Sequence, residues 1–317
     1  IVMAFIKAHS SNIARPEREL KGFKRVHLAV GETKNVSIIL DYDAFKYYLK
    51  GYHNIILWQQ GATGAESYMR HRSKIRKFIL NFMDCFAMRK AKMIFYVSET
   101  MKKYYEALAH TSFSEKAYIM PCFNEFFDPA VFEKKDYSRK IFTYVGSLDL
   151  WQCFDETVEL FAEIERRIPE AFLKVLTFHT EKARQILESK GIKNYSVNCV
   201  PQEQVRAELE EAVFGFILRH DIDVNRVATP TKISSYLSAG VLPIYSSCLE
   251  DFHFRANGKT FAFAMDPGEN AEKLTEYVSR EIDPAVIRPE IEELFRTYYC
   301  AEKHTQDIAA LASSCLC

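Results

Sequence analysis

Residues 214–245 read FGFILRHDIDVNRVATPTKISSYLSAGVLPIY, and this stretch decides the fold. An apolar run, Phe214–Leu218, is followed by a polar loop, a segment of helical character at Thr231–Ser238 and a second apolar run, Val241–Tyr245. Short apolar runs bounded by polar turns predict buried strands, and parallel neighbours need a helical crossover. The stretch therefore predicts a βαβ unit of a parallel sheet.

The same alternation precedes this unit. Further strands are predicted at Ile141–Val145, Phe172–Thr177 and Ser196–Val200, and further helices at Asp155–Arg167, Glu181–Ser189 and Gln202–Glu211. Strands that alternate with helices in this order predict an α/β fold with a doubly wound parallel sheet.

A shorter α/β stretch lies before a proline-containing linker at Pro121–Lys140. It has a predicted strand at Ile55–Trp58, a long helix at Arg70–Lys90 and a buried strand at Met93–Val97. Ser98 is expected to cap the next helix, because its hydroxyl can accept a hydrogen bond from the first turn. The first 45 residues read as β segments, at Ile1–Ile6, Arg25–Leu28 and Val36–Leu40.

The composition excludes several classes of protein. The 317 residues carry 42 Lys+Arg and 42 Asp+Glu, so the formal net charge is zero, and 48% are hydrophobic. These values exclude a disordered chain and argue against a general nucleic-acid binder, which needs a basic excess. No apolar run reaches the roughly 18–20 residues of a membrane span. We expect that a signal peptide is absent or was removed.

The eight cysteines are scattered through hydrophobic contexts and form no C-x-x-C pair. A chain of this size does not need disulfides to fold. We therefore expect reduced thiols in a cytoplasmic protein, and no zinc site.

Three basic residues mark the polar loop and the helix that follow the strand at 214–218. They are Arg219, Arg226 and Lys232. Free N–H groups at a helix start favour phosphate, and nearby cations add to that preference. The loop therefore predicts a diphosphate site; solvated basic residues on a capped helix are the alternative.

The helix in this stretch has recognisable ends. Thr229 suits the N-cap, Pro230 the first turn and Gly240 the C′ position. The strand at 141–145 also ends in glycine, Gly146, which lets a ligand approach the backbone, with Gln152 close behind. An ordinary turn is the alternative for this second segment.

The helix predicted at Arg70–Lys90 is strongly basic. Residues 70–92 contain eight Lys+Arg and one acidic residue, Asp84. Apolar residues recur at helical spacing in the same segment, namely Ile75, Phe78, Ile79, Phe82 and Phe86. Basic residues beside an apolar stripe suit an anionic lipid surface. A core-facing helix with a solvated basic face is the alternative.

Over about residues 50–317 these segments resemble glycosyltransferase family 4. In the second half the resemblance rests on YVGSL at 144–148 with WQ at 151–152, and on LR, NRVA and PTK at 218–219, 225–228 and 230–232. In the first half it rests on ILWQQG at 56–61 with ES at 66–67, and on VSETM at 97–101. Members of that family have the GT-B fold of two facing Rossmann-like domains.

The resemblance implies transfer of a sugar from a nucleotide-diphosphate sugar to a polysaccharide or lipid-linked acceptor. It implies retention at the anomeric carbon and no tightly bound metal or cofactor. The donor-binding residues that it implies are Gly146, Ser147, Gln152, Arg219, Asn225, Arg226, Pro230, Thr231, Lys232 and Ser235. The acceptor-side candidates are Gly61, Gly64 and Glu66, and no catalytic residue is identified.

Ser235 departs from the family pattern. It stands where the family has a carboxylate that binds the donor ribose. A serine can still form a hydrogen bond, but it lacks the charge-assisted contact of a carboxylate.

The first 45 residues resemble a different module. RPERELKGFKRVHL at 15–28 and GETK at 31–34 resemble the fibronectin type III-like domain at the C-terminus of glycoside hydrolase family 3 β-glucosidases. The segment corresponds to the middle strands of such a sandwich, and a sandwich needs both sheets to bury a core. We do not expect it to fold alone.

The two resemblances divide the chain into four parts. These are a partial fibronectin type III-like segment at 1–45, a truncated acceptor-side Rossmann-like domain at 46–138, a complete nucleotide-sugar-binding Rossmann-like domain at 139–285 and a helical region at 286–317.

Two hypotheses for function follow. The first is a bacterial, cytoplasmic glycosyltransferase of polysaccharide biosynthesis, with a peripheral contact to the inner face of the membrane through residues 70–92. The second is a non-catalytic fusion or fragment, in which a β-glucosidase accessory segment is joined to an incomplete transferase. Neither has a nucleic acid as partner.

Overall fold

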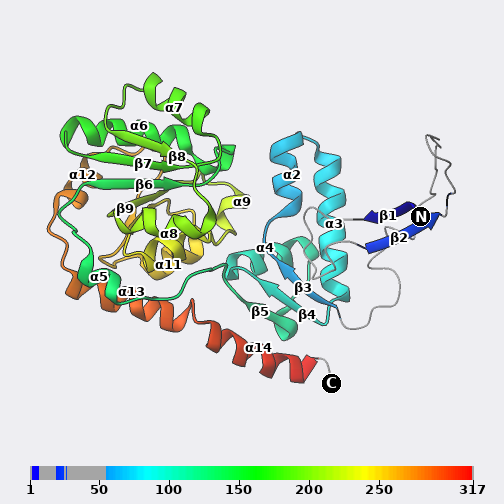
Figure 1. Ribbon diagram of the computed structural model, residues 1–317. Coiled ribbons are helices and arrows are strands. Elements are labelled where there is room, and N and C mark those ends of the chain that lie inside the picture. Colours follow the sequence, from blue (N-terminus) through cyan, green and yellow to red (C-terminus); the bar gives the residue numbers. More distant parts are fainter. Residues whose placement is uncertain (1, 7–18, 25, 27–54, 316–317) are drawn as a thin grey trace. The chain divides into compact units, whose positions relative to one another are not determined.

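A six-stranded sheet forms the centre of the C-terminal half in the computed structural model (Figure 1). Its strands are β6 Ile141–Val145, β7 Phe172–Leu176, β8 Tyr195–Asn198, β9 Phe214–Ile217, β10 Leu242–Tyr245 and β11 Phe263–Ala264. The strand order is β11-β10-β9-β6-β7-β8, and every neighbouring pair is parallel. The order reverses between β6 and β9, which confirms the predicted α/β, doubly wound sheet.

The structure describes residues 2–6, 19–24, 26 and 55–315. The chain divides into two compact units. The N-terminal unit comprises Ile1–Tyr96, Tyr105–Tyr118 and Ala309–Cys317, and the C-terminal unit comprises Val97–Tyr104 and Ile119–Ile308.

Helices lie before, between and after the strands of the C-terminal unit. They are α5 Ala130–Lys134, the 3-10 turn η2 Leu150–Gln152, α6 Phe154–Arg167, α7 Thr180–Ser189, α8 Gln202–Glu210, α9 Asp223–Arg226, α10 Lys232–Ser238, α11 Glu250–Ala256, α12 Glu272–Ser279 and α13 Pro284–Thr297. In α6, Val158, Phe161 and Ile164 recur at helical spacing, and all three are fully buried. Burial of such a stripe supplies most of the stability of a helix this short.

Aromatic rings join the two central strands. Phe142 of β6 stacks on Phe214 and Phe216 of β9, with ring centroids 5.1 and 5.6 Å apart. The ring of Tyr236 lies against Gly215, where a Cβ would come within 2.3 Å of it. Each buried aromatic ring contributes roughly 1.5–3 kcal/mol, so this packing firmly fixes β6 beside β9.

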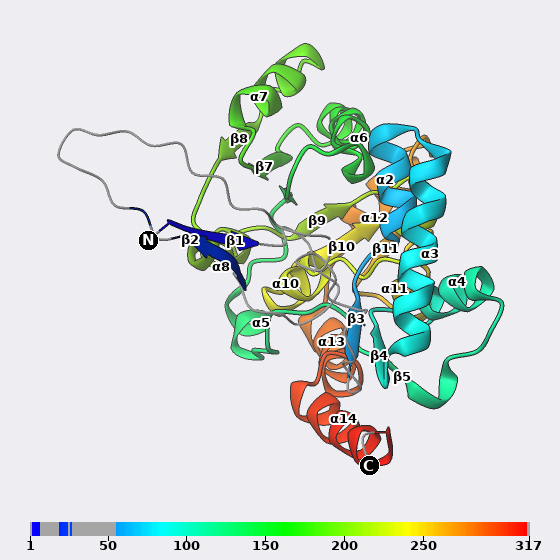
Figure 2. The same cartoon turned by 90° about the vertical axis from the view of Figure 1, so that its right-hand side faces the viewer.

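The N-terminal unit contains a three-stranded sheet with the order β3-β4-β5, in which β3 and β4 are parallel. Its strands are β3 Ile56–Gln59, β4 Met93–Tyr96 and β5 Ala117–Ile119. Its helices are α2 Thr63–His71, α3 Lys74–Lys90 and the 3-10 turn η1 Ser114–Lys116, while α4 Glu99–Ala109 and α14 Ala301–Cys315 contribute residues to both units. Helices α2 and α3 run side by side in both views (Figures 1 and 2).

The helix predicted at Arg70–Lys90 is confirmed from Lys74 to Lys90, but its predicted start is wrong. The helical conformation is interrupted between α2 and α3, because Arg72 adopts a left-handed conformation (φ 54°) and ends α2. Ser73 then caps α3, its hydroxyl accepting a hydrogen bond from the Arg76 N–H at 3.3 Å. The predicted cap at Ser98 is confirmed, since its hydroxyl accepts from the Met101 N–H at 2.9 Å.

The apolar stripe of α3 does not face a core in the described structure. Ile75, Phe78 and Phe82 are 75%, 72% and 59% exposed, whereas Cys85 and Met88 are buried. The core-facing alternative is therefore wrong for the N-terminal part of the stripe, whereas Phe86 at its other end is half-buried. None of the helices in the described residues is both long and apolar enough to cross a bilayer.

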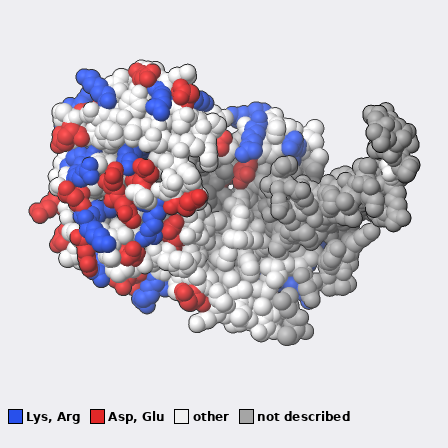
Figure 3. Space-filling model, in the orientation of Figure 1, with Lys and Arg blue, Asp and Glu red and all other residues white. Residues whose placement is uncertain are grey.

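Near the N-terminus, two antiparallel strands pair, β1 Val2–Ile6 with β2 Glu19–Lys24. Strand β2 was not among the predicted segments. The segments predicted at Arg25–Leu28, apart from Val26, and at Val36–Leu40 lie outside the described residues. Over the C-terminal unit, basic and acidic side chains intermingle on the face seen in Figure 3, which agrees with the zero net charge.

Candidate functional site

The candidate site lies where the carboxyl ends of β6 and β9 meet. Gly146 directly follows β6, and Arg219 follows β9 after one residue. In doubly wound sheets, ligands bind outside the carboxyl ends of the strands at the point where strand order reverses. The fold thus brings together the two segments that sequence predicted to be chemically important.

Two cations converge on one oxygen at this point. Arg219 Nη2 and Lys232 Nζ donate to Oε1 of Gln152 at 2.7 and 2.9 Å. Arg219 is only 3% exposed, and its Nη1 donates to the backbone oxygens of Leu218 and Gln152. Among the described residues, neither cation has a carboxylate within ion-pair distance. We call Gly146, Gln152, Arg219 and Lys232 the donor cluster.

Burial and mutual repulsion act on both charges. Burial lowers the pKa of Lys232 well below its usual value, and the charge of Arg219 lowers it further. Burial also lowers the pKa of the Arg219 guanidinium. Two enclosed like charges that share one neutral acceptor are costly. An anion bound between them would favour the charged form of both, so the cluster is suited to a phosphate or diphosphate.

Gly146 lies at the end of β6 directly beside Lys232. Its φ of +145° is a conformation that residues with a Cβ rarely adopt, and a Cβ there would lie 2.9 Å from Lys232 Nζ. Its N–H continues the sheet by donating to the Leu176 oxygen at 3.0 Å. Ser147, the next residue, donates from its hydroxyl to Asp149 Oδ2 at 2.8 Å and shapes the loop.

The helix behind the cluster starts later than predicted. Thr231, not Thr229, occupies the N-cap of α10, and the Thr229 hydroxyl instead accepts from the Cys122 N–H at 3.1 Å. Pro230 was predicted in the first turn but precedes the N-cap, and its carbonyl accepts from the Ile233 N–H at 3.0 Å. Because α10 has only seven residues, its dipole is a weak source of positive potential. The site therefore depends on the two side-chain cations.

The far end of α10 follows the prediction. Gly240 has a φ of +65°, and the N–H of Val241 donates back to the Tyr236 oxygen at 2.8 Å. This is the hydrogen-bond pattern of a Schellman end. Gly240 at C′ is therefore confirmed.

Three other predicted donor residues have partners elsewhere. Arg226 forms two short contacts to Asp221, at 2.5 and 2.8 Å, so its charge is already balanced. Buried Asn225 donates to the His220 oxygen at 2.9 Å and fixes the loop. The hydroxyl of Ser235 donates to Asn124 Oδ1 at 2.9 Å. The structure does not bring these three side chains to the oxygen of Gln152.

Two tyrosines support the cluster and were missed by sequence reasoning. Lys232 Nζ lies 5.2 Å from the ring centroid of Tyr144, a cation–π distance. The hydroxyl of Tyr236 accepts from the Val145 N–H at 3.1 Å, at the end of β6. Both are fully buried. Both tyrosines lie among apolar residues in the sequence, which indicates a role in the core. Their contacts to Lys232 and to Val145 become apparent only in the fold.

The acceptor-side candidates lie in the N-terminal unit. A Cβ on Gly61 would lie 2.2 Å from Glu66 Oε1, so the carboxyl packs directly on this glycine. Burial raises the pKa of Glu66. Helix α2 begins at Thr63, so Gly64 lies inside it, where a Cβ would lie 2.0 Å from Asn81 Oδ1 of α3. Gly64 therefore serves helix packing.

A half-buried carboxyl close to Gly61, that of Asp84, was not predicted. Asp84 Oδ2 accepts from the Tyr105 hydroxyl at 2.9 Å, and Gln59 Nε2 donates to the Gly61 oxygen at 2.6 Å. Burial raises the pKa of Asp84 to about 6. Its position in a basic amphipathic stretch resembled that of an ordinary surface residue, so the sequence contained no signal for it.

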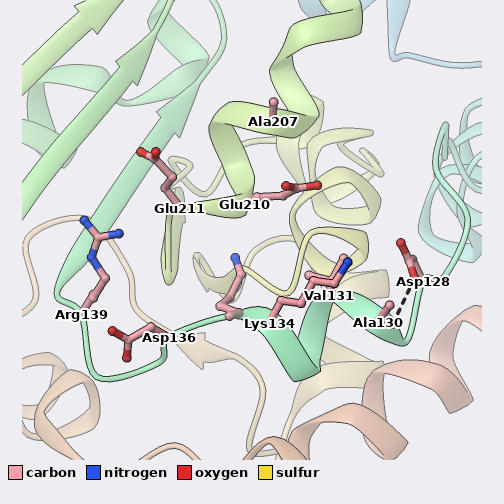
Figure 4. Close-up of a pocket in the computed structure, with 10 residues that line it drawn as sticks. Asp128, Ala130, Val131, Lys134, Asp136, Arg139, Ala207, Glu210 and Glu211 are labelled. Carbon is pink, nitrogen blue, oxygen red and sulfur yellow. Dashed lines mark hydrogen bonds between the residues drawn. The ribbon is translucent and has the colours of Figure 1, made fainter.

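A separate cavity of about 410 Å³ lies at the opposite edge of the large sheet, before the start of β6 (Figure 4). Glu210 and Glu211 stand on one side of it, and Lys134 and Arg139 on the other. It contains none of the predicted site residues. Ligands of doubly wound sheets bind at the carboxyl edge, so we assign it no role.

Known proteins resemble different parts of the chain. Residues 1–60 match the fibronectin type III-like domain family. The chain is 46% identical over 56 residues to thermostable beta-glucosidase B of Acetivibrio thermocellus, and 42% identical over 53 residues to an exo-alpha-(1->6)-L-arabinopyranosidase of Bifidobacterium breve. Each match covers 17% of this chain and 7% of the relative.

Solved structures resemble a larger part. A sucrose-phosphate synthase from Thermosynechococcus elongatus has a TM-score of 0.58 at 14% identity, covering 82% of this chain and 67% of that one. A UDP-forming alpha,alpha-trehalose-phosphate synthase from Burkholderia vietnamiensis has a TM-score of 0.58 at 13% identity, and the match covers 83% of this chain and 70% of that one. A variant of S. aureus TarM, in complex with fondaparinux, alpha-GlcNAc-glycerol and UDP, has a TM-score of 0.55 at 9% identity. That match covers 71% of this chain and 44% of the other.

These identities show the fold alone, and the chain spans only part of each relative, from 7% of the curated proteins to 70% of a solved one. The chain thus joins an N-terminal segment that matches the fibronectin type III-like family to an α/β part with the fold of the GT-B glycosyltransferases.

Proposed function

We propose that the chain binds a nucleotide-diphosphate sugar at the donor cluster and transfers the sugar to a glycan or lipid-linked acceptor, with retention at the anomeric carbon. The observation that carries the proposal is the pair of cations, Arg219 and Lys232, that share one neutral oxygen. Two solved structures of similar fold, one described as UDP-forming and one in complex with UDP, support the same ligand class.

The chemistry follows from the positions of the charges. When the bond between sugar and diphosphate breaks, negative charge grows on the diphosphate. Arg219 and Lys232 are held in place before the reaction, by Gln152 and by surrounding burial. Fixed positive charges in an enclosed site stabilise such developing charge without reorganisation. Gly146 has no Cβ, so a phosphate could approach its backbone closely.

Calorimetric titration with UDP and GDP tests the donor site. We expect saturable binding of one of the two, and Lys232→Ala should weaken it about tenfold to a hundredfold, because a charge-assisted hydrogen bond contributes about 1.5–3 kcal/mol. Lys182→Ala, an exposed lysine on α7, is the matched control and should leave the affinity unchanged. Absence of saturable binding to the wild-type chain would contradict the proposal.

A non-catalytic fragment is the second candidate. The chain spans 44% to 70% of the solved chains described above, which favours testing turnover separately from binding. Release of UDP from UDP-sugars, with and without a glycan acceptor, distinguishes the two. Binding without turnover would support the fragment.

For the acceptor side, we propose a peripheral contact with an anionic bilayer through α3. The stripe of exposed apolar side chains on this helix consists of Ile75, Phe78, Ile79, Phe82 and Met83. Basic residues flank it at both ends, and the helix has one acidic residue, Asp84, which is half-buried. An apolar face between cations fits the interface of a membrane with negative headgroups.

A further inference from the structure

The loops that form the donor cluster also bring three potential metal ligands together. Cys153 directly follows Gln152, Glu156 lies one turn further on in α6, and His220 directly follows Arg219. The Cys153 sulfur, a carboxylate oxygen of Glu156 and a ring nitrogen of His220 all lie within 4.8 Å of one another. In the part of the chain that the structure describes, this is the only such group of three.

The surroundings of the group suit a site with one closed and one open side. Cys153 is 2% exposed, whereas the side chains of Glu156 and His220 are 30% and 48% exposed. His220 Nε2 lies 2.6 Å from Glu156 Oε1, so these two side chains are already directed at each other. On the other side of the loop, the Cys248 thiol is directed at the backbone oxygens of Arg219 and His220, at 3.6 and 3.5 Å.

The donor set selects the class of cation. A thiolate, an imidazole and a carboxylate together are typical of Zn²⁺ and of metals with similar preferences, whereas Mg²⁺ and Ca²⁺ prefer oxygen alone. Three protein ligands leave a fourth tetrahedral position for water or for an oxygen of a ligand. Tetrahedral metal–ligand bonds of about 2.0–2.3 Å place neighbouring ligand atoms about 3.3–3.8 Å apart. The group lies within 4.8 Å, and His220 Nε2 and Glu156 Oε1, now 2.6 Å apart, would have to separate to admit the metal.

We propose that Cys153, Glu156 and His220 bind a zinc-class divalent cation. On binding, the thiol of Cys153 loses its proton to solvent, the sulfur and the neutral His220 ring each donate an electron pair to the metal, and the Glu156 carboxylate replaces its contact to His220 with one to the metal. The prediction that the chain has no zinc site considered spacing along the sequence. The proposed ligands come from two loops that only the fold brings together.

The cation would connect the loop after β6 to the loop after β9. Gln152 and Arg219 are the immediate neighbours of two ligands, so metal binding would fix the positions of both in the donor cluster. This consequence rests on the proposed function, whereas metal binding itself does not. The two are therefore tested separately.

Titration of the reduced full chain with Co²⁺, without nucleotide, tests the site. We expect one equivalent to bind with a thiolate-to-cobalt charge-transfer band in the near ultraviolet, and Zn²⁺ to displace it. Cys153→Ser should abolish the band, and His220→Ala and Glu156→Gln should each weaken binding at least tenfold. The matched control is Cys199→Ser, because Cys199 is an exposed free cysteine, and it should keep the band.

Two results would overturn the proposal. One is the absence of stoichiometric cobalt binding; the other is a band that persists in Cys153→Ser or disappears equally in Cys199→Ser. Misfolding is excluded by a second measurement: Zn²⁺ alone should raise the unfolding temperature of the wild type and of Cys199→Ser, but not that of His220→Ala. Calorimetry of UDP with and without Zn²⁺ then tests the coupling; equal affinities would reject the coupling while the metal site stands.

Discussion

Arg219 and Lys232 share a single acceptor atom, Oε1 of Gln152, at 2.7 and 2.9 Å. A neutral amide oxygen can orient both cations, but it cannot balance their charge. The cluster therefore keeps an unbalanced positive potential around the buried guanidinium of Arg219. This potential is what a bound diphosphate would neutralise.

Replacement of Gln152 with glutamate should separate stability from binding. A carboxylate between Arg219 and Lys232 would supply the missing negative charge, so we expect the unfolding temperature to rise by about 2–4 °C for each 1 kcal/mol gained. UDP affinity should fall at least tenfold, because the new charge occupies the place of the anion. Calorimetry and thermal melting measure the two effects.

Gln204→Glu is the matched control for this change, because Gln204 is exposed on α8. It should alter neither quantity. If Gln152→Glu left UDP affinity unchanged, the anion would not bind between the two cations.

Gly146→Ala should lower both the stability of the protein and its affinity for UDP. A residue with a Cβ at a φ of +145° costs about 1–3 kcal/mol, and the new methyl group would displace the Lys232 amine. Gly191→Ala is the control, since Gly191 also has a positive φ (+72°) but has nothing within 4 Å of its added Cβ. Urea denaturation should show a loss of stability in both variants, whereas UDP affinity should fall only in Gly146→Ala.

The stability of the N-terminal unit should depend on the pH through Asp84. Burial raises the pKa of this carboxyl from 3.8 to about 6, so the folded state holds its proton more tightly than the unfolded state does. The contribution of Asp84 to the free energy of unfolding is then highest at low pH. It decreases by about 2–3 kcal/mol in total as the pH rises from about 4 to 6.

Asp84→Asn should remove that dependence. Urea denaturation at about pH 4.5 and about pH 7, near the two ends of the titration range, measures the free energy of unfolding at each pH. We expect these two free energies to differ less in the variant than in the wild type. Glu276→Gln, at an exposed position of α12, should behave like the wild type. An unchanged difference in Asp84→Asn would mean that this carboxyl is not perturbed by folding.

The exposed face of α3 predicts binding to anionic vesicles. Sedimentation with vesicles rich in phosphatidylserine should retain the wild-type chain, and Phe78→Ser and Phe82→Ser should each lower the partition coefficient about tenfold, since burial of a Phe side chain contributes about 1.5–3 kcal/mol. Higher salt should weaken binding by screening the flanking cations.

Phe178→Ser is the matched control for the vesicle experiment, because Phe178 is 82% exposed and lies in the C-terminal unit. It should bind vesicles as the wild type does. Equal binding to vesicles of phosphatidylcholine alone, or no effect of either α3 substitution, would reject the membrane contact.

The large sheet was predictable because its strands are short apolar runs between helices of regular period. The strand at Ile141–Val145 was predicted to the residue, and the other central strands within one or two. Arg219 and Gly146 could be placed at one site for the same reason, since parallel strands put their carboxyl ends at one edge.

Features that depend on three-dimensional neighbours were not predictable. Nothing in the sequence distinguished Arg226, which pairs with Asp221, from Arg219, which pairs with no acid among the described residues. The apolar stripe of α3 was visible in the sequence, but its exposure was not. Apolar residues that recur with a period of 3.6 identify one face of a helix, but they do not show whether another part of the protein packs against that face.

The order of the large sheet has a consequence for folding kinetics. Strands β6 and β9 are neighbours, although β7 and β8 lie between them along the chain. Their pairing closes a long loop, and contacts of that kind form slowly. The donor cluster can therefore exist only after this distant pairing is complete. A nucleotide bound there should slow unfolding of the C-terminal unit without accelerating its folding.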